Sequence, residues 1–466
     1  MWKHPVTLLA LLLILWTPTA VQASSPSDWW DTTWTYRQEI MLPIDLHSPG
    51  AGGQPIDLHL ALTNPCWTHD TNNTSLRIIC EANGDTTELE SELYNLTIST
   101  TDHITATNLI FILPENLTGT EHLYAYYTNT PTPAPHYPDH ITVTTSSYYL
   151  EPIPGYSVQS QYYLISDDHH PIYAISYAGQ FLYYTTTQYV TKLLPNATTV
   201  LPTTTDTLAS FEFKYYYDTP LNAFQTTADH ATTHTIQRDG TLSTVIQIQS
   251  ESKDHTLHTT ATYTYYHTTT TTHTRIRIHT DDTTTQACNI IPGASTDGTY
   301  AQLQCGGIHT TTMPELNINH LYPFAHLHTT TGPQEYHIDQ NPDYSTDPVT
   351  RIISPTDNID LTTPAYATFD QGTNGTAHAL IYATTHVTTN TTDEHDGIQT
   401  NIYESNTPNL PGFRNTAAIL QCNRDTATTT GGTQDLTIPT GFHATITTEY
   451  YTTTTGLTAV QHEAQL

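Results

Sequence analysis

The sequence predicts an all-β protein, with an N-terminal β-sandwich followed by a larger antiparallel β-sandwich. Threonine and tyrosine, which suit pleated and half-exposed β surfaces, recur along the whole chain. Stretches of alternating apolar and polar residues repeat at intervals of roughly 8 to 12 residues, separated by Thr, Asn, Asp, Pro and Gly clusters. No amphipathic pattern predicts a helix longer than a turn or two.

The clearest strands lie between Arg238 and Thr280. The hairpin-turn dipeptide Asp239-Gly240 is followed by an alternating stretch from 242 to 249. The alternation resumes from 257 to 265 and again from 274 to 279, after short polar turns. These stretches predict an antiparallel meander of three consecutive strands.

The formal net charge of −32, with only 12 Lys and Arg, excludes nucleic acid as a partner and disfavours anionic membranes. Residues 1–23 carry a basic Lys3, an apolar run and a small-residue close, which is typical of a secretory signal peptide. That run is too short to span a membrane comfortably, and no later stretch is a better candidate. We therefore expect a secreted or cell-surface protein that is not integral to the membrane and has no carboxy-terminal anchor. Glycosylation sequons are consistent with this and lie at Asn72, Asn73, Asn95, Asn116, Asn196, Asn374 and Asn390.

The cysteines predict two local disulfides. In a secreted chain, Cys66 is expected to pair with Cys80 and Cys288 with Cys305, which leaves Cys422 unpaired. No Cys-x-x-Cys sequence is present, so a thiolate zinc site is not expected.

The chain after the signal peptide opens with two tryptophans, Trp29-Trp30, and reaches Trp34, Tyr36 and Arg37. This W-W-x-x-x-W-x-Y-R motif resembles the opening of domain of unknown function 2341, a secreted prokaryotic module, and the resemblance covers roughly residues 28 to 130. It implies a β-sandwich over 24–130, associated with cell surfaces and carbohydrates. The Asp-rich segment usual in that family is replaced here by Asn72-Asn73-Thr74. A Pro-rich stretch predicts a linker over 131–147.

The second domain, residues 148–466, resembles the β-supersandwich of galactose-mutarotase-like proteins and polysaccharide lyases. The resemblance rests on a Gly-led strand from Gly240, a Tyr-x-Tyr-Tyr strand ending at Tyr266, and a charged third strand from Thr274 to His279. An ordinary jelly roll or stacked immunoglobulin-like sandwiches are alternatives. Lyases of this type usually carry a helical toroid before the sandwich, and this chain shows none.

A row of basic side chains predicts a ligand-binding face. His273, Arg275, Arg277 and His279 alternate along one strand and should share a face. Guanidinium groups pair bidentately with carboxylates, so the row would suit carboxylated sugars. The alternative is charge pairing with Glu251, Asp254 or Asp281 on a solvated surface.

Two segments are candidate sites for a divalent metal. His326 and His328 should point to the same face of a strand, with Glu335, His337 or Asp339 as further ligands. Asp167, Asp168 and His169 gather donors between two strands, and residues 339–347 form a comparable acidic loop. The alternative is ordinary surface histidines and a polar turn.

A lyase would need a cation to neutralise a uronate carboxylate and a nearby base. Arg275 or Arg277 could supply the cation, and Tyr265, Tyr322 or His326 the base, but no spacing fixes such a set. No pair of carboxylates stands out for glycoside hydrolysis. Motifs for serine hydrolases, phosphate loops and dinucleotide binding are absent.

Tyrosine-rich strands could stack on sugar rings, with Tyr215 and Tyr217 the best candidates for an outward-facing platform. The sequence therefore favours a secreted or surface β protein that binds an extracellular glycan or a cell-envelope component without catalysis. A polysaccharide lyase-like enzyme and a structural envelope or filament subunit are the alternatives.

Overall fold

The prediction of an all-β fold is confirmed. The structure is a computed structural model that describes residues 29–42, 44–82, 84–100, 102–117, 119–153, 156–177, 181–184, 207–211, 214–216, 225–227, 230–285, 288–290, 302–304, 306–312, 322–329, 332–337, 350–352, 357–359, 365–388, 394–395, 398–406, 414–421, 436–438 and 440–466. Within these ranges the named elements are antiparallel strands and one short helix. Among the described residues, no helix is long and apolar enough to cross a membrane. The expected signal peptide lies outside these ranges, as do Tyr217, Cys305 and Cys422.

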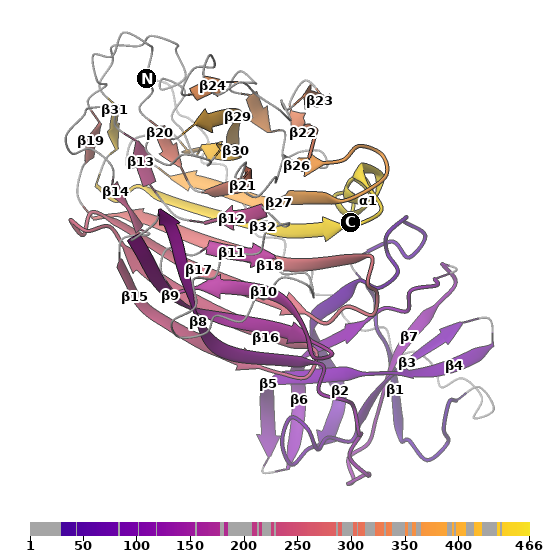
Figure 1. The fold of residues 1–466 in the computed structure, drawn as a ribbon. Helices are drawn as coiled ribbons and strands as arrows, with labels where there is room; N and C mark the ends of the chain where they lie inside the picture. Colours follow the sequence, from indigo (N-terminus) through magenta and orange to yellow (C-terminus); the bar gives the residue numbers. More distant parts are fainter. Residues whose placement is uncertain are drawn as a thin grey trace, which may run out of the picture.

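The first strands form a two-sheet sandwich, coloured indigo to purple in Figure 1. One sheet has the order β1-β7-β3-β4 and the other β2-β6-β5. The strands are β1 Tyr36–Glu39, β2 Pro55–Trp67, β3 Leu76–Ala82, β4 Asp85–Leu89, β5 Ser91–Thr100, β6 His103–Ile112 and β7 His122–Tyr127. Alternate residues of both sheets, such as Ile56 on β2 and Ile78 on β3, meet in one buried core.

The two cysteines of this sandwich are not bonded to each other, which corrects the predicted Cys66–Cys80 disulfide. They lie on β2 and β3, which belong to different sheets. The Cys66 thiol instead donates a hydrogen bond to the carbonyl oxygen of Ser75, 3.3 Å away. Burial raises the pKa of Cys66 to about 12 and that of Cys80 to about 11, so both are unreactive neutral thiols. The side chain of Cys288 lies outside the described part of the chain, so the second predicted pair is not addressed.

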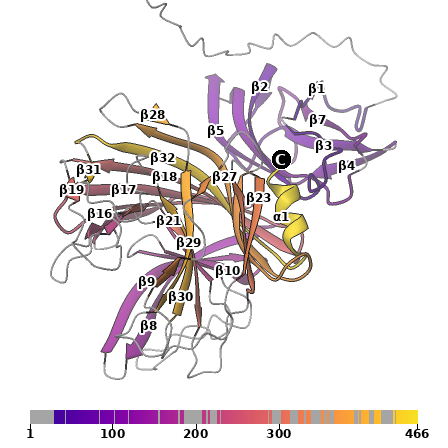
Figure 2. The same ribbon diagram turned by 90° about the horizontal axis from the view of Figure 1, so that it is seen from above.

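The larger domain consists of two antiparallel layers (Figures 1 and 2). The first, the meander layer, contains the predicted meander as β16, β17 and β18 and confirms it. Its strands, in spatial order, are β15 His230–Asp239, β16 Ser243–Glu251, β17 Leu257–Tyr266, β18 His273–Thr284, β32 His443–Thr453, β27 Ala377–Thr388, β26 Tyr366–Asp370, β22 Phe324–Thr329 and β23 Gly332–His337.

The second, the covering layer, runs from β8 through β12 and then to β21, β30 and β29. Its strands are β8 Ile141–Ile153, β9 Tyr156–Asp167, β10 His170–Ser176, β11 Phe181–Tyr184, β12 Thr207–Ser210, β21 Gly306–Thr312, β30 Arg414–Gln421, β29 Ile398–Asn406, β24 Thr350–Ile352 and β25 Asp357–Ile359. Thr329 of β22 pairs with Ile359 of β25, which joins the two layers at one edge. The remaining short strands are β13 Lys214–Tyr216, β14 Gln225–Thr226, β19 Cys288–Ile290, β20 Gln302–Gln304, β28 Glu394–His395 and β31 Leu436–Ile438.

The two layers bury one apolar core between them. Residues of the meander layer such as Ile246 and Ile276 lie in the same cluster as Ile165 and Ile175 of the covering layer. Tyr173 of the covering layer also places its hydroxyl 3.0 Å from that of Thr274 across the core. Each such side chain contributes roughly 1.5–3 kcal/mol when fully buried. This explains why the inward-facing positions alternate so clearly in the sequence.

The helix α1, Leu457–Glu463, was not predicted. It packs Leu457 and Val460 against Ala379, Ile381 and Tyr451 on the outer face of the meander layer. Both faces of β27 therefore carry apolar residues, because Ala379 and Ile381 pack against the helix while Leu380 and Tyr382 face the core between the layers. Its seven residues are too few to show helical periodicity.

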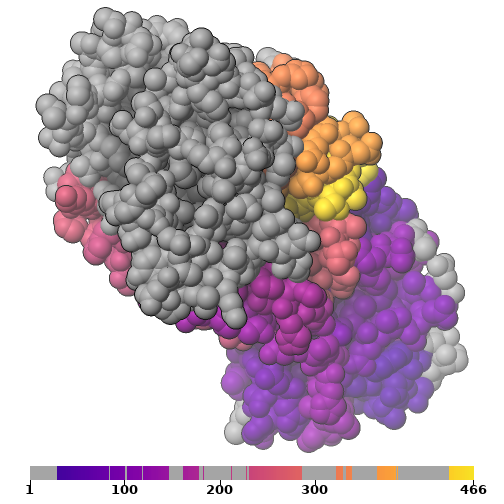
Figure 3. Space-filling view, viewed as in Figure 1, coloured from indigo at the N-terminus to yellow at the C-terminus, as the bar shows by residue number. Residues whose placement is uncertain are grey.

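The two domains meet closely, and the segment between them is partly strand. β8 begins at Ile141, inside the predicted linker of residues 131–147. Glu92 of β5 accepts hydrogen bonds from the backbone N–H groups of Leu242 and Ser243, at 2.8 and 2.9 Å. Figure 3 shows the C-terminal segment, in yellow, against the indigo and purple N-terminal sandwich. The relative placement of the domains is therefore fixed by specific contacts at both ends of this interface.

Candidate functional site

A pocket of about 350 Å³ lies where the N-terminal sandwich meets the outer face of the meander layer. One wall comes from the segment that leads into β2 and from β2 itself, and the other from β18, β27, β32 and α1. Its polar lining residues are Gln54, Asp57, Arg277, Thr448, Glu449 and Glu463. Its apolar lining includes Ile44, Ile56 and Ile381. This mixture in a concave site is typical of small-molecule binding.

Arg275 and Glu463 fix one side of the pocket. Arg275 is only 4% exposed. Its Nη2 donates a hydrogen bond to Glu463 Oε2 at 3.3 Å, its Nε lies 3.2 Å from Glu463 Oε1, and its Nη1 donates to the carbonyl oxygen of Gly53 at 3.0 Å. Gln54 Nε2 donates to Glu463 Oε1 at 2.8 Å. The Glu463 carboxylate therefore has a guanidinium and an amide as partners, and it links α1 to both domains.

Glu449 is a half-buried neighbour on β32 whose carboxyl is hydrogen-bonded to Glu463. Burial and the negative charge of Glu463 together raise the pKa of Glu449 to about 8. At neutral pH the Glu449 carboxyl is therefore mostly protonated and donates to Glu463. Two carboxyl groups in direct contact leave no room for the separation of about 5 Å or more that glycoside hydrolysis requires.

Arg277 is the exposed cation of the pocket. It lies directly opposite Glu449 in the β18–β32 pairing. Its guanidinium lies 5.8 Å from the centre of the Tyr266 ring, and among the described residues it forms no short ion pair. Because Glu449 is mostly neutral, the charge of Arg277 remains available to a ligand.

Asp57 forms the opposite wall and is held in place by two tyrosines. The hydroxyl of Tyr94 donates to Asp57 Oδ1 at 2.7 Å, and that of Tyr266 donates to Oδ2 at 2.9 Å. Asp57 and Tyr94 both belong to the N-terminal sandwich, whereas Tyr266 belongs to β17, so the bond from Tyr266 crosses the domain interface. The polar lining is thus preorganised from both sides.

The predicted basic row is one face of β18, but its four members have different environments. Arg275 is buried in its ion pair with Glu463, not paired with Glu251, Asp254 or Asp281. Burial, aided by the charge of Arg275, lowers the pKa of His273 to about 3, so this imidazole is neutral. His279 is exposed, and its Nδ1 lies 2.9 Å from the Thr447 hydroxyl. Arg277 is therefore the member that faces the pocket as a free charge.

The lyase candidates are not assembled around an open cleft. Tyr265 is fully buried and donates to Asp167 Oδ2 at 2.6 Å, and its burial raises its pKa well above the ordinary value. Tyr322 is also buried, with its hydroxyl 2.8 Å from His378 Nε2. Neither can serve as a base beside Arg277. The side chain of Tyr215 and all of Tyr217 lie outside what the structure describes.

His326 and His328 lie on β22 but do not converge on a common point. His326 Nδ1 lies 2.7 Å from Asp370 Oδ2 and its Nε2 lies 3.1 Å from Glu335 Oε2, so both ring nitrogens contact carboxylates. The His328 ring instead stacks on Tyr366 at 5.7 Å. Asp339 and the rest of 338–349 fall outside the described ranges.

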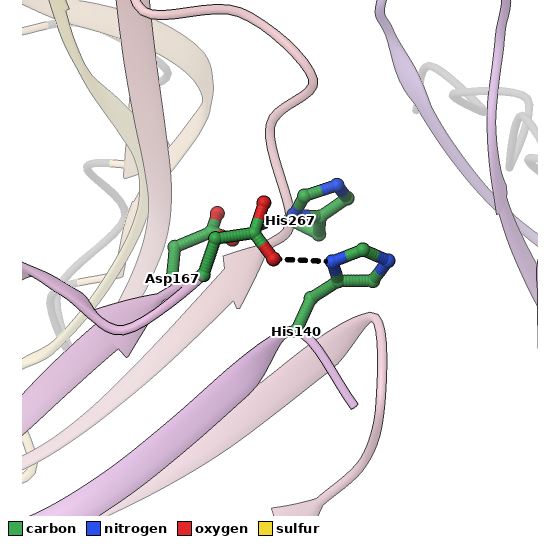
Figure 4. A group of neighbouring side chains, drawn as sticks. His140, Asp167 and His267 are labelled. Atoms are coloured by element: carbon green, nitrogen blue, oxygen red, sulfur yellow. Dashed lines mark hydrogen bonds and ion pairs between the residues drawn. The ribbon is translucent and has the colours of Figure 1, made fainter. Parts of the chain in front are cut away.

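Asp167 and Asp168 join two histidines that were not predicted. His140 directly precedes β8, Asp167 ends β9, Asp168 follows it, and His267 directly follows β17. One donor atom from each of these four residues lies within 4.8 Å of the others. Figure 4 shows His140, Asp167 and His267 reaching the same point from separate segments. The predicted partner His169 is exposed at a turn and does not belong to this group.

Sequence reasoning missed the residues that converge only in three dimensions. Gln54, Asp57, Glu449 and Glu463 come from distant segments and carry no shared spacing. His267 had one usable signal, because it follows the predicted Tyr-x-Tyr-Tyr strand beside a polar turn, whereas His140 lay in the predicted linker and had none.

No protein-family model matches this sequence. No curated protein matches it either. Among solved structures, an alpha-mannosidase from Enterococcus faecalis V583 is 7% identical, with a TM-score of 0.34, over 86% of this chain and 41% of that chain. A protein in the glycosyl hydrolase family 38 from Enterococcus faecalis is likewise 7% identical, with a TM-score of 0.32, over 86% of this chain and 43% of that chain. This chain thus spans less than half of either, and likeness at this level says nothing about its activity.

Proposed function

We propose that the protein binds a carbohydrate in the pocket between its two domains and does not cleave it. The observation that carries this proposal is the exposed Arg277 beside the mostly protonated Glu449, in a pocket where Gln54, Asp57 and Glu463 are already held by hydrogen bonds. Preorganised polar groups of this kind bind with little loss of conformational entropy.

A glycan that contains a carboxylated sugar suits this chemistry best. Guanidinium groups form bidentate bonds with carboxylates, and Arg277 is free to offer them. The Glu449 carboxyl, whose proton is donated to Glu463, can accept a hydrogen bond from a sugar hydroxyl, while Ile44, Ile56 and Ile381 provide apolar contact for the faces of the ring. The predicted export of the chain makes the ligand an extracellular glycan or a component of the cell envelope.

The absence of cleavage is part of the proposal. Glu449 and Glu463 contact each other and so lack the spacing of a glycosidase pair. Arg275 is committed to Glu463, and Tyr265 is buried away from Arg277. Among the described residues, none of the predicted cation and base candidates lie together at one open site, as a lyase mechanism would require.

Binding to a glycan array tests the proposal, with residues 24–466 as the probe and ultraviolet absorbance of unsaturated uronates as the readout for cleavage. We expect binding to uronate-containing glycans and no absorbance change. Arg277→Ala should weaken binding about tenfold or more, since hydrogen bonds to charged groups contribute roughly 1.5–3 kcal/mol.

Lys253→Ala is the matched control, because it removes one exposed positive charge on the turn between β16 and β17, away from the pocket lining. Equal loss in both variants would assign the effect to net charge and contradict a site at Arg277. A protein that binds no glycan but assembles with itself would favour the structural-subunit alternative.

A further inference from the structure

The second cluster at the domain interface has the composition of a metal site. Its donors are two imidazoles, His140 and His267, and two carboxylates, Asp167 and Asp168. His140 Nδ1 lies 2.7 Å from Asp168 Oδ1, and His267 Nδ1 lies 2.6 Å from Asp167 Oδ1. The two rings stack with their centres 3.9 Å apart and an angle of 15° between them, and one donor atom of each of the four residues lies within 4.8 Å of the others.

The outer atoms of His140 and Asp167 are already held by a second set of groups. Glu90, in the turn between β4 and β5, contacts His140 Nε2 through its Oε2 at 2.7 Å. The hydroxyl of Tyr265 and the backbone N–H of Thr268 both donate to Asp167 Oδ2, at 2.6 and 3.0 Å. Metal-binding histidines and carboxylates usually have such partners, which fix the ring tautomer and the direction of the ligand atom.

We propose that His140, Asp167, Asp168 and His267 bind one divalent transition-metal ion of the Zn²⁺ class. Two imidazole nitrogens and two carboxylate oxygens suit this class better than Ca²⁺ or Mg²⁺, which prefer more ligands and only oxygen. The two carboxylates balance the charge of the ion. The Nδ1–carboxylate pairs would separate from hydrogen-bond distance to about 3.3 Å, the spacing between ligands around a tetrahedral ion with bonds of roughly 2.0–2.1 Å.

Such an ion would hold together three segments at the ends of β8, β9 and β17. His140 directly precedes β8, Asp167 ends β9 and His267 follows β17, while Glu90 reaches His140 from the N-terminal sandwich. The site is separate from the pocket, whose lining includes none of these residues. The inference therefore does not depend on the proposed carbohydrate binding.

Cobalt binding is the test, because Co²⁺ reports tetrahedral coordination through its visible absorbance and can be displaced by Zn²⁺. The full chain is first stripped with EDTA, then titrated with Co²⁺ and afterwards with Zn²⁺, while the unfolding temperature is followed in parallel. We expect one equivalent of Co²⁺ with a tetrahedral spectrum, displacement by one equivalent of Zn²⁺, and a higher Tm in the loaded protein.

His267→Gln and Asp168→Asn should each abolish the spectrum, and Glu90→Gln, a positioning change, should weaken affinity about 10- to 100-fold. Asp168 is exposed, so its variant is expected to fold even if the His267 variant does not. His255→Gln is the control, since this exposed histidine contacts Glu251 at 2.8 Å in another histidine-rich cluster. Wild-type Co²⁺ spectra in Asp168→Asn, or loss only in His255→Gln, would overturn the proposal.

Discussion

Glu449 shows how one residue's environment sets its chemistry. In the folded protein its pKa is raised to about 8 by burial and by Glu463, whereas its ordinary value is 4.5. Folding therefore takes up a proton between these two pH values. Because the folded state then binds more protons than the unfolded state, the free energy of unfolding contributed by this group falls as the pH rises from about 4.5 to about 8.

Glu449→Gln should remove this dependence, since an amide can still donate to Glu463 but does not titrate. Between about pH 5 and about pH 8 the variant should gain on the order of 1–2 kcal/mol in the free energy of unfolding relative to the wild type, a figure reduced for partial solvent exposure. Urea unfolding at several pH values measures it. Glu39→Gln, an exposed position on β1, serves as the control. If the variant and the wild type show the same slope against pH, the Glu449 carboxyl is not protonated as described.

For single residues, the sequence predicted that the basic side chains share one face of β18, but not which of them are buried and which are exposed. The period of a strand correctly placed His273, Arg275, Arg277 and His279 on the same side of β18. Whether each is buried depends on α1 and on the N-terminal sandwich, which are far away in sequence. Local alternation contains no information about such covering elements, so the buried Arg275 and the exposed Arg277 could not be distinguished.

Among the elements, long strands with clear alternation were predictable and the short helix was not. The meander has turn residues and alternation that agree with each other, and its strands appear as expected. The start of α1 depends instead on Gly456, whose φ of 87° is left-handed. A Cβ at this position would lie only 2.2 Å from the carbonyl oxygen of Thr373.

Gly456→Ala should therefore destabilise the protein through both strain and a backbone clash. Gly84→Ala is a matched control, because Gly84 has the same φ of 87° but open space around it. We expect Gly84→Ala to cost about 1 kcal/mol and Gly456→Ala about 2 kcal/mol more, measured by urea unfolding. Equal costs for the two variants would show that α1 is not packed against the loop of Thr373 as described.

At the scale of the whole molecule, the docking of the two domains creates the pocket and adds Glu90 to the surroundings of the His–Asp cluster. The pocket combines residues of β2, β18, β32 and α1, and the His–Asp cluster combines three strand ends with Glu90. The sequence predicted an all-β chain but could not predict these juxtapositions, because the contacts that dock the domains are single side chains such as Glu92. The metal role predicted for Asp167 and Asp168 stays a prediction, and their neighbours His140 and His267 could be identified only from the fold.

Filling the pocket tests the central claim most directly. Ile44 is half-buried and lines the pocket, whereas Met41, three residues earlier, is 73% exposed and does not. Isothermal titration calorimetry with the uronate glycan bound best on the array would compare Ile44→Trp and Met41→Trp at equal Tm. We predict that Ile44→Trp abolishes binding, because the indole occupies the space of the sugar, and that Met41→Trp binds as the wild type does. Unchanged binding in a folded Ile44→Trp variant would contradict the interdomain pocket as the site.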